Sequence, residues 1–171
     1  MKKAKYTLLS LVAMTFLLFS CNSKDNSIAT QTKTDSLKNE IQILSGNQKQ
    51  LEENKKLVAD FYQEVFGDKD VNSIDKYIGD TYVQHNPSVG DGKEALKQAA
   101  TQWFTGAPKE KIDVQHLNAE GDLVYIHTKS KMGPKTISII DIFKIENGKI
   151  VEHWDVGQEV PEKSANAHPM F

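Results

Sequence analysis

Helical periodicity of the apolar side chains marks the first part of the folded region. Apolar residues recur with i, i+4 and i+8 spacing over residues 57–66, which predicts an amphipathic helix. Residues 71–78 predict a second, shorter helix. Asp91 is placed to cap a third helix over 91–104. Between the second and third helices, residues 82–87 predict a short extended segment that ends at a proline.

After Pro108 the period changes from helical to alternating. Four segments alternate or run apolar in the manner of strands, and they cover residues 112–116, 123–127, 137–145 and 150–156. Gly121-Asp122 and Asn147-Gly148 lie between them as two-residue turn sequences. Helices followed by antiparallel hairpins predict an α+β fold in which the helices pack on one face of a curved sheet.

The N-terminus has the pattern of an exported chain. Lysines precede an apolar run over residues 8–19, which is too short to span a bilayer comfortably but suits a signal peptide. The segment Leu18-Phe19-Ser20-Cys21 resembles a bacterial lipobox, and Cys21 is the only cysteine. We therefore expect a signal peptide over 1–20, lipid on Cys21 and a location at the bacterial cell envelope. An ordinary secretory signal or an uncleaved anchor with a chance cysteine is the alternative.

The segment after Cys21 is polar and almost free of aromatic residues. Residues 21–50 predict a flexible stalk because they offer little apolar surface to bury. Leu37, Ile41 and Leu44 have helical spacing, which indicates that part of the stalk is a helix. The folded domain is expected over residues 51–171.

Charge and motif content exclude several classes of function. The formal charge of −2 becomes −5 after residues 1–20 leave, because they contain three lysines and no acidic residue. A mildly acidic chain with mixed charges argues against nucleic-acid binding. The sequence has no G-x-S-x-G elbow, P-loop or G-x-G-x-x-G, so serine chemistry and nucleotide binding have no support. A single cysteine allows no internal disulfide.

Asp141 is the first candidate for chemistry. It lies in the segment ISIIDIFKI, where both neighbours and the residues two positions away are apolar. A carboxylate there must lie on a largely buried face, and burial of an unpaired charge is costly. Asp141 is therefore a candidate general acid or base. The alternative is a structural aspartate that is bonded to a neighbouring strand, histidine or tryptophan.

Histidines are the second clue to chemistry. His127 shares a strand face with Leu123 and Tyr125, and we expect it to face the same cavity as Asp141. His85 precedes Asn86-Pro87 at a strand end, where a cavity mouth would lie. A lone histidine on an apolar face is more often a satisfied core residue. No histidine pair has the i, i+4 spacing of a helical zinc motif, so no metal site is predicted.

Several segments together resemble the SnoaL-like polyketide cyclase family. They are residues 82–87, 91–94, 141–144 and 146–155, and the resemblance extends over roughly 50–171. Lys144 stands where the family often has arginine. The resemblance implies a nuclear-transport-factor-2-like cone, with three helices wrapped on a strongly bent, mostly antiparallel sheet around a deep apolar pocket. The residues expected to line that pocket are Tyr82, Trp103, Tyr125, Phe143 and Trp154.

The family resemblance also implies a chemistry. Its cyclases close a ring by intramolecular aldol condensation without a metal or organic cofactor, and Asp141 matches their acid–base position, with His127 and His85 orienting the substrate. Fold alone does not assign this reaction. Three hypotheses therefore stand: a cofactor-independent lyase or isomerase acting on a small apolar carbonyl compound, a non-catalytic binder of a small hydrophobic ligand, and an interaction module that forms a homodimer through the open sheet face.

Overall fold

The computed structural model describes residues 23–171. The signal segment 1–20 and the predicted lipidation site Cys21 lie outside the described residues. Among residues 23–171, no helix combines the length and the hydropathy that crossing a bilayer requires. The contacts divide the chain into two compact units, with the division between Ser45 and Gly46.

The segment expected to be a flexible stalk is helical. Helix α1 (Ser23–Phe61) begins in the first unit and ends in the second. Polar side chains one turn apart stabilise its exposed part, for example Gln31 with Asp35 and Lys49 with Glu53. Five large apolar side chains among the described residues of the first unit are exposed: Ile28, Leu37, Ile41, Ile43 and Leu44. The helical spacing noted for three of these residues is real, but their apolar side chains remain in solvent.

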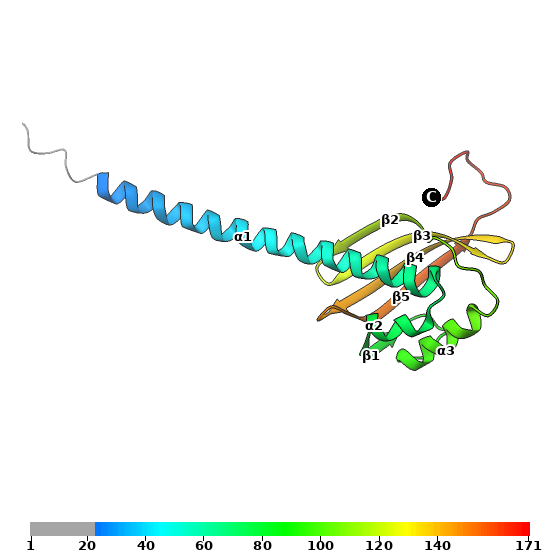
Figure 1. The fold of residues 1–171 in the computed structure, drawn as a ribbon. Helices are drawn as coiled ribbons and strands as arrows, with labels where there is room; N and C mark the ends of the chain where they lie inside the picture. The colour runs from blue at the N-terminus through cyan, green and yellow to red at the C-terminus, as the bar shows by residue number, and fades with distance from the viewer. Residues whose placement is uncertain (1–22) are drawn as a thin grey trace, which may run out of the picture. The chain divides into compact units, whose positions relative to one another are not determined.

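Three short helical segments and one regular helix follow α1 in the second unit. They are the π-helical turn η1 (Tyr62–Gly67), the 3₁₀ turn η2 (Val71–Ser73), α2 (Ile74–Tyr77) and α3 (Lys93–Trp103). The helix count therefore differs slightly from the three predicted, because the first helix ends in a π-turn and the second is split. Figure 1 shows α2 and α3 beside strand β1.

Five strands form one curled, open sheet in the order β1-β5-β4-β3-β2. Strand β1 pairs with β5 in parallel, and the other neighbours are antiparallel. The strands are β1 (Ile78–Gln84), β2 (Asp113–Glu120), β3 (Leu123–Met132), β4 (Lys135–Glu146) and β5 (Lys149–Glu159). The predicted α+β architecture is confirmed.

The turn between β4 and β5 has the geometry that its sequence predicts. Asn147 and Gly148 both have positive φ, at 52° and 71°. Two successive left-handed residues give the turn whose twist matches a hairpin, and Asn-Gly is the sequence that tolerates it best. This turn pairs Ile145 with Ile150, and a register shift between Lys144 and Ile145 then places Asp141 opposite Asp155 and Phe143 opposite His153.

The capping role expected for Asp91 is wrong. The residue at the N-terminus of α3 is Gly92, which has a φ of 89° and makes no side-chain cap. The Asp91 carboxylate instead accepts a hydrogen bond from the backbone N–H of Gln84 at 2.8 Å. Asp91 therefore ties the loop before α3 to the end of β1.

The face assigned to His127 is also wrong. On β3 the buried side chains are Val124, Ile126 and Thr128, and His127 alternates with them. Asp141 pairs with Ile126 and is buried, whereas His127 pairs with the exposed Ile140. Both faces of β3 carry apolar residues, so alternation alone did not identify the inner one. The inner face packs against aromatic side chains from α1 and η1, chiefly Phe61 and Tyr62 on Phe143.

Candidate functional site

Two buried polar side chains meet on the inner face of the sheet. Asp141 on β4 is 5% exposed and His153 on β5 is 8% exposed. Nε2 of His153 lies 2.9 Å from Oδ1 of Asp141. A hydrogen bond across that distance needs one hydrogen between the two atoms, so the pair holds a proton that either group can carry.

Tyr62 is the second hydrogen-bond partner of the Asp141 carboxylate. Its hydroxyl donates to Oδ2 of Asp141 from the first residue of the π-helical turn η1. Burial, followed by the charge of Asp141, raises the pKa of Tyr62 well above its usual value. The Tyr62 hydroxyl therefore stays protonated and acts as a donor. π-Turns inside α-helices often mark functional positions, and this one places the hydroxyl on the carboxylate.

Gln84 fixes which nitrogen of His153 faces Asp141. The backbone N–H of Asn86, which can only donate, lies 2.9 Å from Oε1 of Gln84. The same oxygen is 2.8 Å from Nδ1 of His153, so Nδ1 must be the donor in that contact. Nε2 is therefore the nitrogen that shares a hydrogen with Asp141.

Asp155 brings a second carboxylate to the same place. It is half-buried on β5 and lies opposite Asp141 in the sheet register. Oδ2 of Asp155 accepts a hydrogen bond of 2.7 Å from Nδ2 of Asn86. One ligand atom each from Asp141, His153 and Asp155 lie within 4.8 Å of one another. We call these three residues the Asp–His–Asp cluster.

The negative charge of this cluster has little compensation. His153 is the ion-pair partner of Asp141. Within the described part of the chain, no lysine forms an ion pair with Asp141 or Asp155. Burial and then the charges of Asp141 and Asp155 raise the pKa of Tyr82 above its usual value. The cluster thus generates a negative potential on the inner face of the sheet.

Tyr82 and Phe143 are the predicted pocket residues that border the cluster. Tyr82 is 4% exposed. Its hydroxyl oxygen accepts a hydrogen bond of 3.0 Å from Nε2 of Gln84. The Phe143 ring stacks on His153, with centroids 4.8 Å apart. Both side chains therefore lie on the same face as Asp141.

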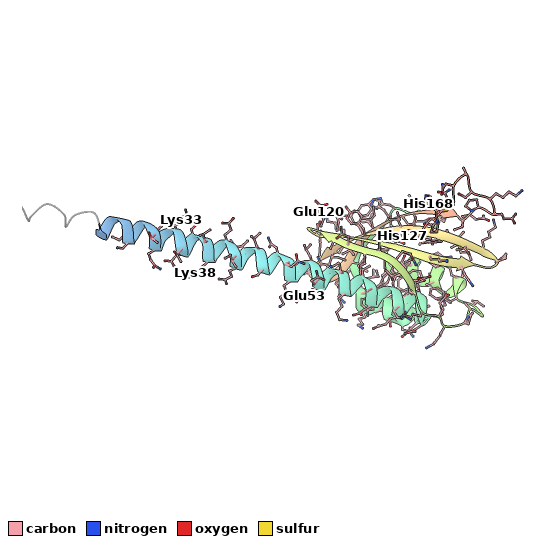
Figure 2. All side chains as sticks on the ribbon, turned by 90° about the horizontal axis from the view of Figure 1, so that it is seen from above. Lys33, Lys38, Glu53, Glu120, His127 and His168 are labelled. Carbon is pink, nitrogen blue, oxygen red and sulfur yellow. The ribbon has the colours of Figure 1, made fainter. Side chains whose placement is uncertain are left out.

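The structure does not bring His127 to Asp141. His127 is labelled on β3 in Figure 2. Its Nδ1 lies 3.0 Å from Nδ1 of His116, and its Nε2 lies 2.7 Å from Oγ of Ser138. The ring of Phe171 stacks on it from the C-terminal tail. His127 belongs to this outer group of polar residues, so a direct contact with Asp141 is excluded by its face.

His85 and the remaining aromatic candidates make their contacts outside the cluster. His85 stacks on Trp154 with centroids 4.5 Å apart, and its Nε2 lies 3.3 Å from Glu152. Trp154 and Tyr125 are both paired with Ile142, whose side chain alternates with the buried Asp141 and Phe143. Trp103 is 50% exposed and stacks on Phe66.

The sequence interpretation missed His153, Asp155, Tyr62, Gln84 and Asn86. A signal for four of them was present in the alternation of the extended segments. In the segment 82–87, Tyr82, Gln84 and Asn86 share the less exposed side, while Val83 and His85 are exposed. His153 and Asp155 likewise alternate with Trp154 on β5. Nothing in the helical pattern distinguishes Tyr62 from its apolar neighbours.

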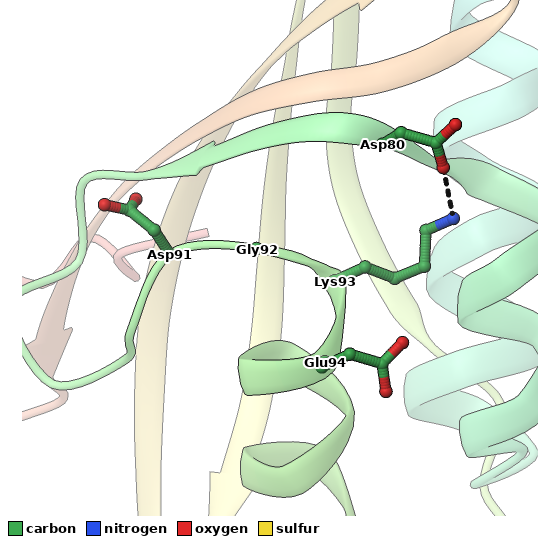
Figure 3. A pocket seen from close by; sticks show the side chains of 5 residues that line it. All are labelled: Asp80, Asp91, Gly92, Lys93 and Glu94. Atoms are coloured by element: carbon green, nitrogen blue, oxygen red, sulfur yellow. Dashed lines mark hydrogen bonds and ion pairs between the residues drawn. The ribbon is translucent and has the colours of Figure 1, made fainter.

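A surface hollow of about 330 Å³ lies at the N-terminus of α3 (Figure 3). It is lined by Asp80, Asp91, Gly92, Lys93 and Glu94. Lys93 bridges to Asp80 at 3.1 Å, as the dashed line in Figure 3 shows. None of these side chains belongs to the Asp–His–Asp cluster, so the hollow and the buried chemistry are separate features.

Comparison with solved structures supports the fold. The chain is similar to TsrD from Streptomyces laurentii, with 21% identity, 61% of this chain and 87% of that chain covered, and a TM-score of 0.51. An LEH-like epoxide hydrolase from M. tuberculosis is 16% identical over 64% of this chain and 85% of its own, with a TM-score of 0.52. An NTF-2-like protein of unknown function from Burkholderia xenovorans is 15% identical over 67% and 89%, with a TM-score of 0.53. At these identities the likeness shows the fold alone.

The sequence itself identifies the family. A comparison with curated proteins finds no match. The model of the SnoaL-like polyketide cyclase family matches residues 56–163, which is more than half of the chain and contains the whole Asp–His–Asp cluster. The chain therefore belongs to the SnoaL-like polyketide cyclase family.

Proposed function

We propose that the Asp–His–Asp cluster performs acid–base chemistry on a small apolar carbonyl compound, with protein groups alone as acid and base. The observation that carries the proposal is the buried Asp141–His153 hydrogen bond with Asp155 opposite it. Membership of a cyclase family supports an aldol-type cyclisation or a related isomerisation or dehydration. Buried carboxyl and imidazole groups commonly act as the general acid and base in such steps.

The hydrogen bonds divide the roles within the cluster. Both carboxylate oxygens of Asp141 are engaged by protein groups, Oδ1 by His153 and Oδ2 by Tyr62. Asp155 is more exposed than Asp141, and its Oδ2 is held by Asn86. Its Oδ1 is therefore the carboxylate oxygen best placed to meet a substrate. Asp141, predicted from the sequence as the acid–base group, would act through His153.

The proposed reaction begins with proton removal from carbon. Asp155 would take a proton alpha to the substrate carbonyl, and the electron pair of the C–H bond would form an enolate. The enolate carbon would attack a second carbonyl of the same molecule, and the new alkoxide would recover the proton from Asp155. The Tyr82 hydroxyl, whose oxygen accepts from Gln84, has its hydrogen available for the enolate oxygen.

We further propose that this chemistry takes place at the cell envelope. The basic, apolar and Leu-Phe-Ser-Cys sequence at the N-terminus supports export and lipid attachment at Cys21. An anchored domain meets its substrate outside the cytoplasm. A compound that diffuses through the envelope suits this location better than an intermediate of cytoplasmic biosynthesis.

Proton exchange on a simple ketone tests the proposed chemistry. The purified protein is incubated with 2-tetralone in D₂O, and loss of the α-proton signals is followed by NMR. We expect faster exchange with the unaltered protein and a return to the buffer rate with Asp155→Asn. Asp80→Asn, which changes an aspartate whose side chain is 98% exposed, should leave the exchange unchanged. Equal exchange rates for the Asp155→Asn and unaltered proteins would show that Asp155 is not the base.

A second candidate function is an interaction through the outer face of the sheet. Ile140 and Val156 lie opposite each other there and are 41% and 69% exposed. Adjacent exposed apolar side chains on one sheet face favour association with another protein surface, here a second copy of the chain. Sedimentation would show a dimer that Val156→Lys disrupts. A monomer at all concentrations would exclude this function.

A further inference from the structure

We propose that the Asp–His–Asp cluster also binds a divalent transition-metal cation. The inference uses the same three residues as the proposed function but concerns a separate property, binding in the absence of substrate. One imidazole nitrogen and two carboxylate oxygens form a donor set that suits zinc and the neighbouring first-row cations. The set includes Nε2 of His153, the nitrogen that Gln84 leaves facing Asp141.

The distances between the donor atoms are close to those that a shared ion requires. Nitrogen and oxygen ligands lie about 2.1 Å from zinc, so two ligands of one ion are separated by roughly 3.0–3.4 Å. Nε2 of His153 and Oδ1 of Asp141 are 2.9 Å apart. The three donor atoms all lie within 4.8 Å of one another. A modest rotation of the half-buried Asp155 side chain would close the remaining gap.

Each of the three ligand residues is also hydrogen-bonded to a residue outside the cluster. Gln84 accepts from Nδ1 of His153. Tyr62 donates to Oδ2 of Asp141. Asn86 donates to Oδ2 of Asp155. Metal ligands in proteins typically have such outer partners, which hold the coordinating atoms in position and set the histidine tautomer. This support is independent of the presence of acidic residues.

The charge of the cluster also favours a cation. The contact between Asp141 and His153 holds one hydrogen, and the cluster has two carboxyl groups for one imidazole. A divalent ion that displaces this proton leaves two carboxylates, a neutral imidazole and the ion, with a net charge of zero. Binding would therefore release one proton for each ion. The bound ion would occupy the donor atoms that the acid–base mechanism uses, so it would inhibit that chemistry.

Calorimetric titration of the chelator-treated protein with Zn²⁺ tests the site. Repeating the titration at neutral pH in two buffers with different protonation enthalpies measures the protons released. We expect one ion per chain and about one proton released per ion. Asp155→Asn and His153→Gln should each weaken binding at least tenfold. Circular dichroism and thermal unfolding without zinc would show that each variant is folded.

The outer histidines provide a matched control. Nδ1 of His116 and Nδ1 of His127 are 3.0 Å apart on the other face, so this pair is the competing zinc site. The double variant His116→Gln, His127→Gln should bind zinc as the unaltered protein does. Binding that survives in folded Asp155→Asn and His153→Gln, or that disappears in the double variant, overturns the proposal. Absent zinc binding together with retained ketone exchange would overturn the metal site and leave the acid–base function standing.

Discussion

His153 donates its Nδ1 hydrogen to Oε1 of Gln84 across 2.8 Å, and this bond determines the chemistry available to the imidazole. The backbone N–H of Asn86 orients the Gln84 amide, so the direction of donation does not depend on an assumed tautomer. Because Nδ1 is occupied, Nε2 is the atom that faces Asp141. Residues 84–86 thus determine which nitrogen of His153 on β5 faces Asp141 on β4.

Loss of the Gln84 amide should release the histidine ring. In Gln84→Leu, Nδ1 of His153 has no acceptor from residue 84, so the preference for a hydrogen on Nδ1 should weaken. We expect a change in the ¹⁵N shifts of the His153 ring and at least a tenfold fall in ketone exchange. Gln115→Leu, which alters a glutamine on β2 bonded to Asp113, is the control and should change neither quantity. An unchanged His153 spectrum in Gln84→Leu would refute the orienting role of the amide.

Asp141→Asn should preserve the fold and abolish proton exchange. The asparagine oxygen can accept from Tyr62, and its NH₂ group can donate to Nε2 of a neutral His153, so both hydrogen bonds of Asp141 have replacements. We expect the free energy of unfolding to change by less than about 1.5 kcal/mol. Exchange on 2-tetralone should return to the buffer rate, because Asp141 is proposed to act through His153, whose ring lies beside the base Asp155. Chemical denaturation and NMR measure the two quantities on the same samples.

Asp141→Leu is the contrasting variant. It leaves the buried Tyr62 hydroxyl and His153 without their partner, which should cost about 3 kcal/mol of stability. If the asparagine variant loses as much stability as the leucine variant, the replacement bonds do not form. If it retains full exchange activity, Asp141 has no part in the proton transfer.

The fold was predictable to a large extent, and the departures have physical causes. The turn at Asn147-Gly148 was predictable because its backbone geometry depends on the two residues themselves. The inner face of β3 was not, because Leu123 and Tyr125 are apolar on one side and Val124 and Ile126 on the other. Only packing against α1 and η1 decides between those faces.

The site was less predictable than the fold. Asp141 was recognised because a charge between apolar residues is conspicuous within a strand. Its real partners come from β5 and from η1, so their proximity depends on strand register and on the π-turn at Tyr62. His127 was chosen for the strand face that it shares with Leu123 and Tyr125, and His85 for its place at a strand end, but neither side chain lies on the face of Asp141. Residue type identified one member of the cluster, and register supplied the others.

Tyr62→Phe should destabilise the protein, because the buried Asp141 carboxylate loses a hydrogen-bond donor. The substitution keeps the ring contacts with Phe61 and Phe143 but removes the hydroxyl donor from the buried Asp141. We expect a loss of about 1–3 kcal/mol in the free energy of unfolding. Tyr125→Phe removes a hydroxyl from the outer face and should change stability by less than about 0.5 kcal/mol. Similar urea midpoints for the two variants would contradict the buried bond.

Alkaline pH should destabilise the protein through its buried tyrosines. The pKa values of Tyr62 and Tyr82 are raised in the folded state, in both cases first by burial and then by the charge of Asp141. Above about pH 10 the unfolded chain loses these protons while the folded chain keeps them, so the unfolded state binds fewer protons and stability falls as pH rises. Each tyrosine contributes about 1.4 kcal/mol per pH unit in this range, and neither affects stability below it.

Urea unfolding between pH 9 and 12 measures this dependence. Lysines also titrate there, so the informative quantity is the difference in slope between the unaltered protein and Tyr62→Phe. We expect the variant to have a shallower slope by about 1.4 kcal/mol per pH unit. Parallel stability curves would mean that Tyr62 ionises in the folded protein as readily as in the unfolded chain.

Cys21→Ser tests whether lipid on Cys21 anchors the protein to a membrane. If Cys21 is lipidated, the unaltered protein should incorporate labelled palmitate and sediment with membranes, because several acyl chains give stable anchoring. The serine variant should lose the label and leave the membrane fraction. An uncleaved apolar segment over 8–19 makes the opposite prediction, because the variant would remain membrane-bound with residues 1–20 still attached. Mass spectrometry of the N-terminus separates the two outcomes. Release of the serine variant would show that lipid on Cys21 anchors the protein, whereas retention would require another explanation for the single cysteine.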